Sequence, residues 1–208
     1  KTEFINFNYQ VKNMNFDNGI FDYSPRYTYY IDISEDNLII TTQNGKFYRI
    51  SNKDVLSKEK NIKKKKLKTN INFSRILDSL IIDDKLYISV ARKFDKCEKL
   101  FIYASQVDSQ TENLDFKVLK KFEECNTKNI AGRMQPLNFQ SKKGILISTG
   151  SRGEGMDYPG NYSQDDSSIF GKTLFIDLNS LKHFTFSTGH RNAQGLFVHE
   201  NKILLTEH

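Results

Sequence analysis

Helical periodicity, long apolar runs and cysteine are all scarce in this chain of 208 residues, and each scarcity excludes a class of protein. Apolar residues rarely recur at helical spacing, so we expect almost no helix. No apolar run reaches the ~18 residues that a membrane-spanning helix needs. The two cysteines, Cys97 and Cys125, belong to no Cys-x-x-Cys pair, which argues against a zinc site.

The two cysteines leave two alternatives open. Each lies in a polar segment, so a single disulfide between neighbouring loops is one alternative if the protein is exported. Two free thiols are the other, and the sequence alone does not separate them.

Positive charge is concentrated in one stretch. The net charge is +6, and seven lysines lie between Lys58 and Lys68. Such a run is typical either of a surface for nucleic acid or anionic membrane, or of a solvated loop between strands. The lysines do not follow helical spacing, and no Arg-aromatic interleaving accompanies them. We therefore favour the solvated loop and expect no nucleic acid or membrane as partner.

Short apolar runs rich in aromatic and β-branched residues, separated by Asn, Asp, Gly and Ser, predict strands along most of the chain. Asn44-Gly45 separates the apolar runs 38–42 and 46–50, and this pair predicts a two-residue type I′ hairpin turn. A second hairpin is predicted from strands over 85–91 and 99–105.

An internal repeat gives the architecture. Four segments each consist of a small or polar residue, three apolar residues and then Ser or Thr; they cover residues 37–41, 85–89, 144–148 and 202–206. A period of 40–60 residues made only of strands is typical of a β-propeller built from four-stranded antiparallel blades. We therefore predict an all-β fold, with residues 1–208 as one partial propeller domain of about three and a half blades and residues 1–24 as a lead-in.

This prediction has one structural consequence and one alternative. A blade buries its faces only against neighbouring blades, so we expect the polypeptide to continue or a second chain to complete the ring. An irregular β-sandwich is the alternative fold, and it does not predict the repeat.

The most specific motif lies near the end of the sequence, over Gly189-His190-Arg191-Asn192-Ala193-Gln194-Gly195-Leu196, with Thr206-Glu207-His208 after it. It resembles the Gly-His-Arg-Asn-Pro-Gln-Gly-Leu and Thr-Glu-His motifs of the soluble quinoprotein glucose/sorbosone dehydrogenase family (PQQ-dependent aldose sugar dehydrogenase-like). Ala193 stands where that family usually has Pro. Weaker similarities are Gly132-Arg133-Met134, the loop at 148–153, and Gly171-Lys172.

The resemblance implies a six-bladed propeller, a periplasmic or extracellular location, and oxidation of the anomeric hydroxyl of an aldose to a lactone. The cofactor would be pyrroloquinoline quinone (PQQ) in a cleft on top of the ring, with calcium whose ligands would fall beyond residue 208. By position, Arg191, Asn192 and His208 would line that cleft. The alternative interpretation makes Arg191 and Asn192 a structural hydrogen-bonding corner between blades.

One departure from the family affects catalysis. The family's base His precedes its Gly-Arg-Leu by three positions, and this position falls on Asn129. An amide does not accept a proton near neutral pH, and no histidine precedes His183. Two hypotheses follow: a quinone-dependent sugar dehydrogenase with an altered base, or a non-catalytic propeller that binds a sugar, another small molecule or a protein.

Overall fold

Strands dominate the protein. The computed structural model describes residues 28–58, 62–126, 130–151, 162–200 and 202–207. Strands account for 63% of these residues, which confirms the all-β expectation. The single helix within the described ranges is α1 (Asn52–Leu56), whose first turn is capped by the Ser51 hydroxyl. None of the described segments forms a helix long and apolar enough to cross a membrane.

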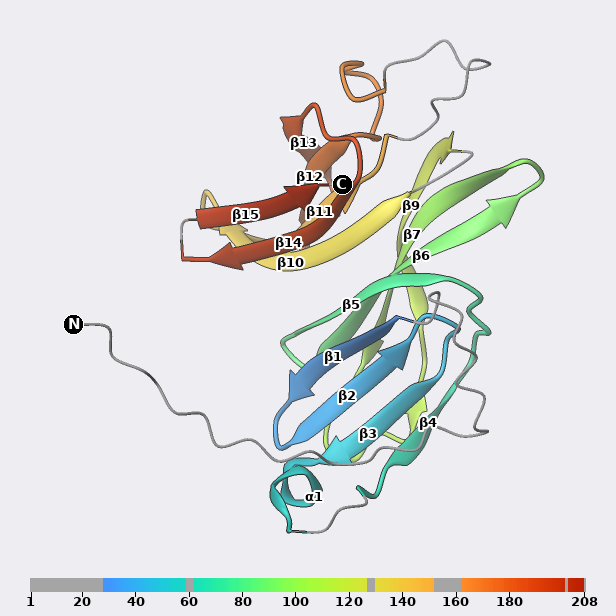
Figure 1. The fold of residues 1–208 in the computed structure, drawn as a ribbon, viewed down its shortest axis with the longest axis vertical. Helices are drawn as coiled ribbons and strands as arrows, with labels where there is room; N and C mark the ends of the chain where they lie inside the picture. The colour runs from blue at the N-terminus through green and yellow to red at the C-terminus, as the bar shows by residue number, and fades with distance from the viewer. Residues whose placement is uncertain (1–27, 59–61, 127–129, 152–161, 201, 208) are drawn as a thin grey trace.

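Within the described residues, the strands form three sheets and a hairpin, each built from a consecutive stretch of chain except for one short strand added to the first sheet (Figure 1). The first sheet contains β1 (Tyr29–Ser34), β2 (Asn37–Thr42), β3 (Phe47–Ser51) and β4 (Lys65–Thr69), with β8 (Asn113–Leu114) parallel to β4 at its edge. The second contains β5 (Ile76–Ile82), β6 (Lys85–Phe94), β7 (Cys97–Gln106) and β9 (Lys117–Asn126). The third contains β10 (Ala131–Phe139), β11 (Lys142–Thr149), β12 (Lys172–Asp177) and β13 (His183–Thr188), and β14 (Ala193–His199) pairs with β15 (Lys202–Glu207) as the hairpin. Apart from the β4–β8 pair, all neighbours are antiparallel.

The first strand of each unit contacts the first strand of the next, in the order β1, β5, β10 and β14. The second sheet lies between the other two and is buried on both faces. Ile88 and Tyr103 face the first sheet, whereas Tyr87 and Ile102 face the third. This double burial explains why the β6 and β7 segments are almost continuously apolar, since successive side chains of a strand point to opposite faces.

The sequence repeat has a structural counterpart. Its four segments lie in the second strands, β2, β6, β11 and β15. In two of them the terminal hydroxyl donates to the first strand of the following unit: Ser89 Oγ to the Gly132 carbonyl at 2.7 Å, and Ser148 Oγ to the Ala193 carbonyl at 3.1 Å. The Thr41 hydroxyl is buried without a hydrogen-bond partner among the described residues.

The predicted type I′ turn at Asn44-Gly45 is wrong. Gly45 has φ 82°, but Asn44 does not share the positive φ that a type I′ turn requires at both central residues. The connection has three residues, closed by a bond from the Thr42 amide to the Lys46 carbonyl at 2.9 Å. Gln43 explains the difference, because its carbonyl accepts from the Ile76 amide at 2.8 Å and so fixes the turn against β5.

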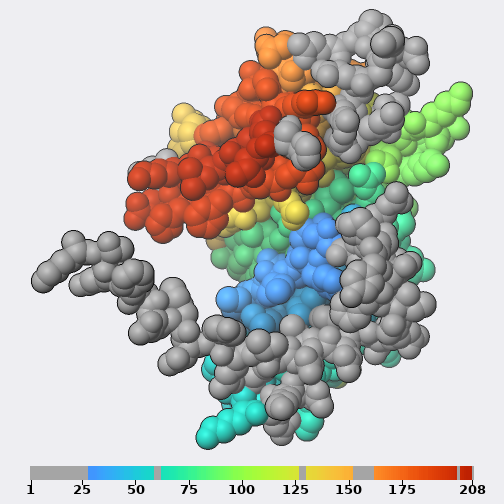
Figure 2. Space-filling view, in the orientation of Figure 1, coloured from blue at the N-terminus to red at the C-terminus, as the bar shows by residue number. Residues whose placement is uncertain are grey.

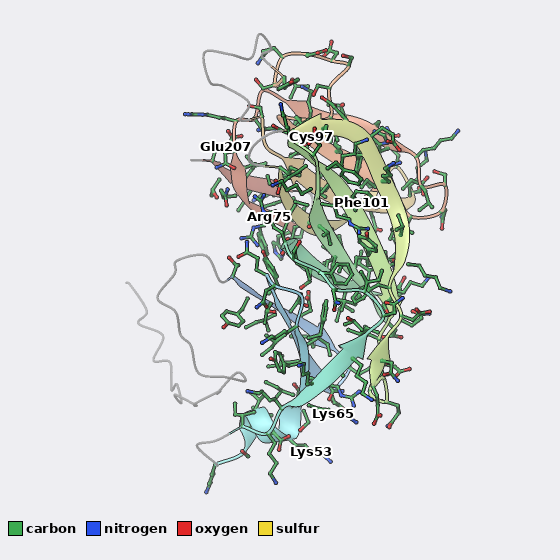
Figure 3. The ribbon with its side chains drawn as sticks, turned by 90° about the vertical axis from the view of Figure 1, so that its right-hand side faces the viewer. Lys53, Lys65, Arg75, Cys97, Phe101 and Glu207 are labelled. Atoms are coloured by element: carbon green, nitrogen blue, oxygen red, sulfur yellow. A yellow bond between two sulfur atoms is a disulfide. The ribbon has the colours of Figure 1, made fainter. Side chains whose placement is uncertain are left out.

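Two further outcomes concern the lysine run and the cysteines. Lys65 to Lys68 belong to strand β4 rather than to a loop, although the lysine side chains there are exposed. Cys97 and Cys125 form a disulfide with their Cα atoms 5.7 Å apart, which settles the two alternatives in favour of the bond (Figure 3). The bond joins the beginning of β7 to the end of β9.

Candidate functional site

A cavity of about 130 Å³ lies where the four first strands begin, and we call it the first-strand cavity. Each of the four units contributes side chains from the segment that enters its first strand. The lining residues are Thr28, Tyr30, Gln43, Arg75, Leu77, Ala131, Arg133, Asn192, Ala193 and Gln194. Residues separated by more than 160 positions therefore meet in one polar space that contains two guanidinium groups.

Arg133 is held from several sides. Its Nε donates to the Gln194 carbonyl at 2.9 Å, and its Nη1 lies 3.4 Å from Asp78 Oδ1. The guanidinium also stacks over the Tyr30 ring, 5.3 Å from the centroid. A guanidinium carries five N–H donors, so these bonds leave further donors on a residue that lines the cavity. Arg133 is thus a fixed positive charge between β10 and its neighbours.

Asp78 and Tyr30, which lie beside Arg133, are two titratable residues whose pKa values are raised. Asp78 Oδ2 accepts from the Met134 amide at 2.7 Å. Burial raises the pKa of Asp78 to about 6, although the Met134 bond and Arg133 oppose the rise. Burial also raises the pKa of Tyr30 to about 12, so its phenol stays neutral and donates to the Ile76 carbonyl at 3.2 Å.

Arg75 supplies the second guanidinium, immediately before β5 (Figure 3). Its Nη1 forms an ion pair with Glu98 of β7. Figure 3 places Arg75 toward the same end of the molecule as Glu207, away from Lys53 and Lys65. The lysine-rich strand β4 therefore contributes nothing to the cavity.

The glycine-histidine motif builds a corner that positions the entry to β14. His190 Nε2 lies 2.6 Å from Ser187 Oγ, and its Nδ1 is hydrogen-bonded to Glu207. The second oxygen of Glu207 accepts from the Arg191 amide at 3.0 Å. Because β15 thus holds the turn between β13 and β14, this network fixes the backbone that presents Asn192 to the cavity.

The structure separates the two described residues that the resemblance assigned to a cofactor. The Asn192 side chain lines the cavity, where its Oδ1 accepts from Gln194 Nε2 at 2.8 Å. The Arg191 side chain is exposed and does not belong to the lining. Asn129 and His208 lie outside the described residues. The cofactor roles of Arg191, Asn192 and His208, and the base position at Asn129, remain predictions.

Sequence reasoning missed most of the cavity. Arg133 entered only as part of a weak family similarity, and Arg75, Gln43 and Tyr30 were not singled out at all. One signal was present: most lining residues lie at or just before the start of the strand that precedes each repeat segment. What the sequence does not reveal is that these four starts converge.

No group of three or more His, Cys, Asp or Glu side chains that could hold a metal ion occurs among the described residues. The calcium that the family resemblance implies was expected beyond residue 208 and stays a prediction. Neither the protein-family models nor the curated proteins contain a match to this chain. The fold and the cavity therefore define an all-β protein with a polar cavity between its first strands.

The cavity suits PQQ in charge but not in size. PQQ is a fused tricyclic tricarboxylate, and guanidinium groups pair well with carboxylates. However, sites for drug-sized ligands and cofactors usually measure about 300–1,000 Å³, and an engineered cavity of about 150 Å³ in another protein binds benzene or xenon. At about 130 Å³, the first-strand cavity does not fit the whole of PQQ.

Proposed function

We propose that this chain is a segment of a β-propeller that binds a small molecule in the first-strand cavity without oxidising it. Each of the three sheets would be one blade, with β8 added to the edge of the first, and β14–β15 would be the first half of another. The side-by-side first strands support this assignment, as do the hydroxyl bonds that join the second unit to the third and the third to the hairpin.

Exposed apolar surfaces at both ends of the array support further blades around a ring. On β1, Ile31 and Ile33 are 61% and 68% exposed, and on β15 Leu204 is 60% exposed. Figure 2 shows the surfaces of β1–β2 (blue) and of the β14–β15 hairpin (red) on one side of the molecule. Exposed apolar faces of this kind mark contact surfaces, and the family resemblance implies six blades in all.

The composition of the cavity carries the functional proposal. Among the described residues, its lining contains amides, hydroxyls and the side chains of two arginines, but no His, Asp, Glu or Lys. Oxidation of a sugar hydroxyl needs a group that accepts the hydroxyl proton, and such a base contributes about 10²–10⁴-fold to the rate. Tyr30, whose pKa is about 12, does not act as a base near neutral pH. The cavity is therefore built for binding.

The competing function is a PQQ-dependent sugar dehydrogenase, which the motif at 189–196 favours. The test supplies the protein with PQQ and calcium, follows cofactor binding by absorbance, and measures dye reduction with a panel of aldoses. We expect no turnover by the wild type. If PQQ binds, Asn129→His should introduce weak activity, because it restores a base at the family's position. Rapid wild-type turnover would contradict the proposed function.

A further inference from the structure

We infer that the first-strand cavity is a binding site for a small oxyanion, either a carboxylate or a phosphate, of about six heavy atoms or fewer. This inference rests on the proposed binding function and names the chemical class of its ligand. The small size is suggested by the volume of about 130 Å³, which is comparable to an engineered cavity of about 150 Å³ that binds benzene elsewhere.

The two guanidinium groups provide the attraction. Arg75 and Arg133 enter from adjacent first strands and both line the cavity. Arg133 is fixed by the Gln194 carbonyl, by Asp78 and by the Tyr30 ring, so little side-chain freedom is lost when a ligand binds. Planar guanidinium groups match the paired oxygens of carboxylates and phosphates, and such charge-assisted bonds are the stronger hydrogen bonds in proteins.

The amides around the arginines complete a donor-rich lining. The Asn192 amide oxygen accepts from Gln194, and its NH2 group carries two further donors that can serve a ligand. Gln43 lies on the same cavity, and its backbone is tied to both Thr28 and Ile76. Over the part of the chain that the structure describes, a lining that has two arginines and no carboxylate suits an acceptor-rich anion better than a neutral polyol.

Two carboxylates behind the arginines regulate the site. Glu98 pairs with Arg75, and Asp78 pairs with Arg133. The charged or titratable groups that face Asp78 are Arg133 of β10 and both Tyr30 and Asp32 of β1. Because the pKa of Asp78 is raised to about 6, this carboxyl gains a proton between pH 7 and pH 5. Arg133 then loses its counter-charge, and the affinity for an anion increases.

The experiment is a calorimetric titration of the protein at fixed ionic strength, at pH 7 and pH 5. The probes are oxalate, inorganic phosphate, and glycerol, which is neutral and has as many heavy atoms as oxalate. Arg75→Gln and Arg133→Gln remove one guanidinium each. Arg49→Gln is the matched control, because Arg49 is an exposed partner of the Asp108 carbonyl and does not line the cavity. Asp78→Asn removes the counter-charge.

We expect oxalate, phosphate or both to bind the wild type, more tightly at pH 5, and the stronger of the two to identify the anion. Either cavity variant should lose about tenfold or more in affinity, the equivalent of one charge-assisted bond, while Arg49→Gln should bind like the wild type. Asp78→Asn should bind more tightly at pH 7 and lose most of the pH dependence. If Arg133→Gln does not fold, the tighter anion binding of Asp78→Asn at pH 7 tests the role of the Arg133 charge in its place.

Three results would overturn the inference: no anion binding by the folded wild type, glycerol bound as tightly as oxalate, or unchanged affinity in Arg75→Gln and Asp78→Asn. Glycerol binding without anion binding would leave the proposed binding function intact. Sugar oxidation with PQQ would overturn that function instead, so the two failures are distinguishable.

Discussion

At the scale of single residues, Asp78 is the group whose ionisation matters most. Its carboxylate accepts a hydrogen bond from the Met134 amide and forms an ion pair with Arg133. Burial nevertheless raises its pKa from 3.8 to about 6. Between these two values the folded protein holds the proton more tightly than the unfolded chain does. The contribution of Asp78 to the free energy of unfolding is therefore fully present below about pH 4, and it is lost as the pH rises through 6.

We predict that Asp78→Asn removes this dependence. Relative to the variant, the wild type should lose about 2–3 kcal/mol of unfolding free energy between pH 4 and pH 7, because each unit of pKa shift corresponds to about 1.4 kcal/mol. Urea unfolding of both proteins across this range measures the difference. Asp32, whose pKa burial also raises, remains in both proteins and cancels. A wild type that keeps or gains stability relative to the variant as the pH rises would contradict the assignment.

Lys172 illustrates a residue whose role the sequence did not reveal. In the sequence, Lys172 is notable only as part of the Gly171-Lys172 pair that resembles the family. In the structure, its side chain is fully buried. Its Nζ donates to the carbonyls of Tyr162, Ser163 and Phe170 at 2.7, 2.9 and 3.3 Å. Burial lowers the pKa of the ammonium. The residue thus holds the loop before β12, a task that depends on backbone geometry rather than on any sequence pattern.

At the scale of elements, the repeated hydroxyls make a testable set. Ser148 donates to the Ala193 carbonyl and accepts from the Arg133 amide at 3.3 Å, whereas the buried Thr41 hydroxyl lacks a partner among the described residues. We predict that Ser148→Ala lowers the free energy of unfolding by about 1–3 kcal/mol, because it leaves buried backbone groups unpaired. Thr41→Val should be neutral or stabilising. Chemical unfolding measures the free energy of unfolding of both variants. Equal losses would argue against a role of the Ser148 hydroxyl in joining one unit to the next.

The disulfide is the second element-scale feature. Cys97 and Cys125 are 28 residues apart and tie β7 to β9. We predict that the double variant Cys97→Ser with Cys125→Ser loses about 2–4 kcal/mol, since the bond restricts the unfolded chain. A reducing agent should lower the melting temperature of the wild type and leave the double variant unchanged. If reduction has no effect on the wild type, the bond contributes nothing to stability.

The elements also show what the sequence could and could not predict. Short apolar runs and their repeat predicted the strands well, because alternating burial and polar turns are local signals. The Asn44-Gly45 turn failed because a distant partner, the Ile76 amide, binds Gln43. Part of the lysine run became strand β4 because Leu67 packs into the core between the first two sheets, and one buried residue was enough to override a polar stretch.

At the scale of the whole molecule, the cavity could not be predicted for a related reason. Arg75 and Arg133 come from different sheets, and Asn192 comes from a third unit. Strand patterns predict each sheet separately, but not the angle at which one sheet packs on the next. Only the motif residue Asn192 was identified beforehand, because the motif lies at the start of β14.

The hydroxyl bonds between successive units also bear on how the molecule comes apart. Ser89 of the second unit anchors the third, and Ser148 of the third unit anchors the β14–β15 hairpin, so local opening should propagate in one direction along these units, as fraying does in a chain of nearest-neighbour couplings. The β14–β15 hairpin has two strands and little buried surface, whereas β6 and β7 are buried on both faces. Amide hydrogen exchange should therefore be fastest in the hairpin and slowest in β6 and β7, and Ser148→Ala should accelerate exchange in β14 while leaving β6 unaffected.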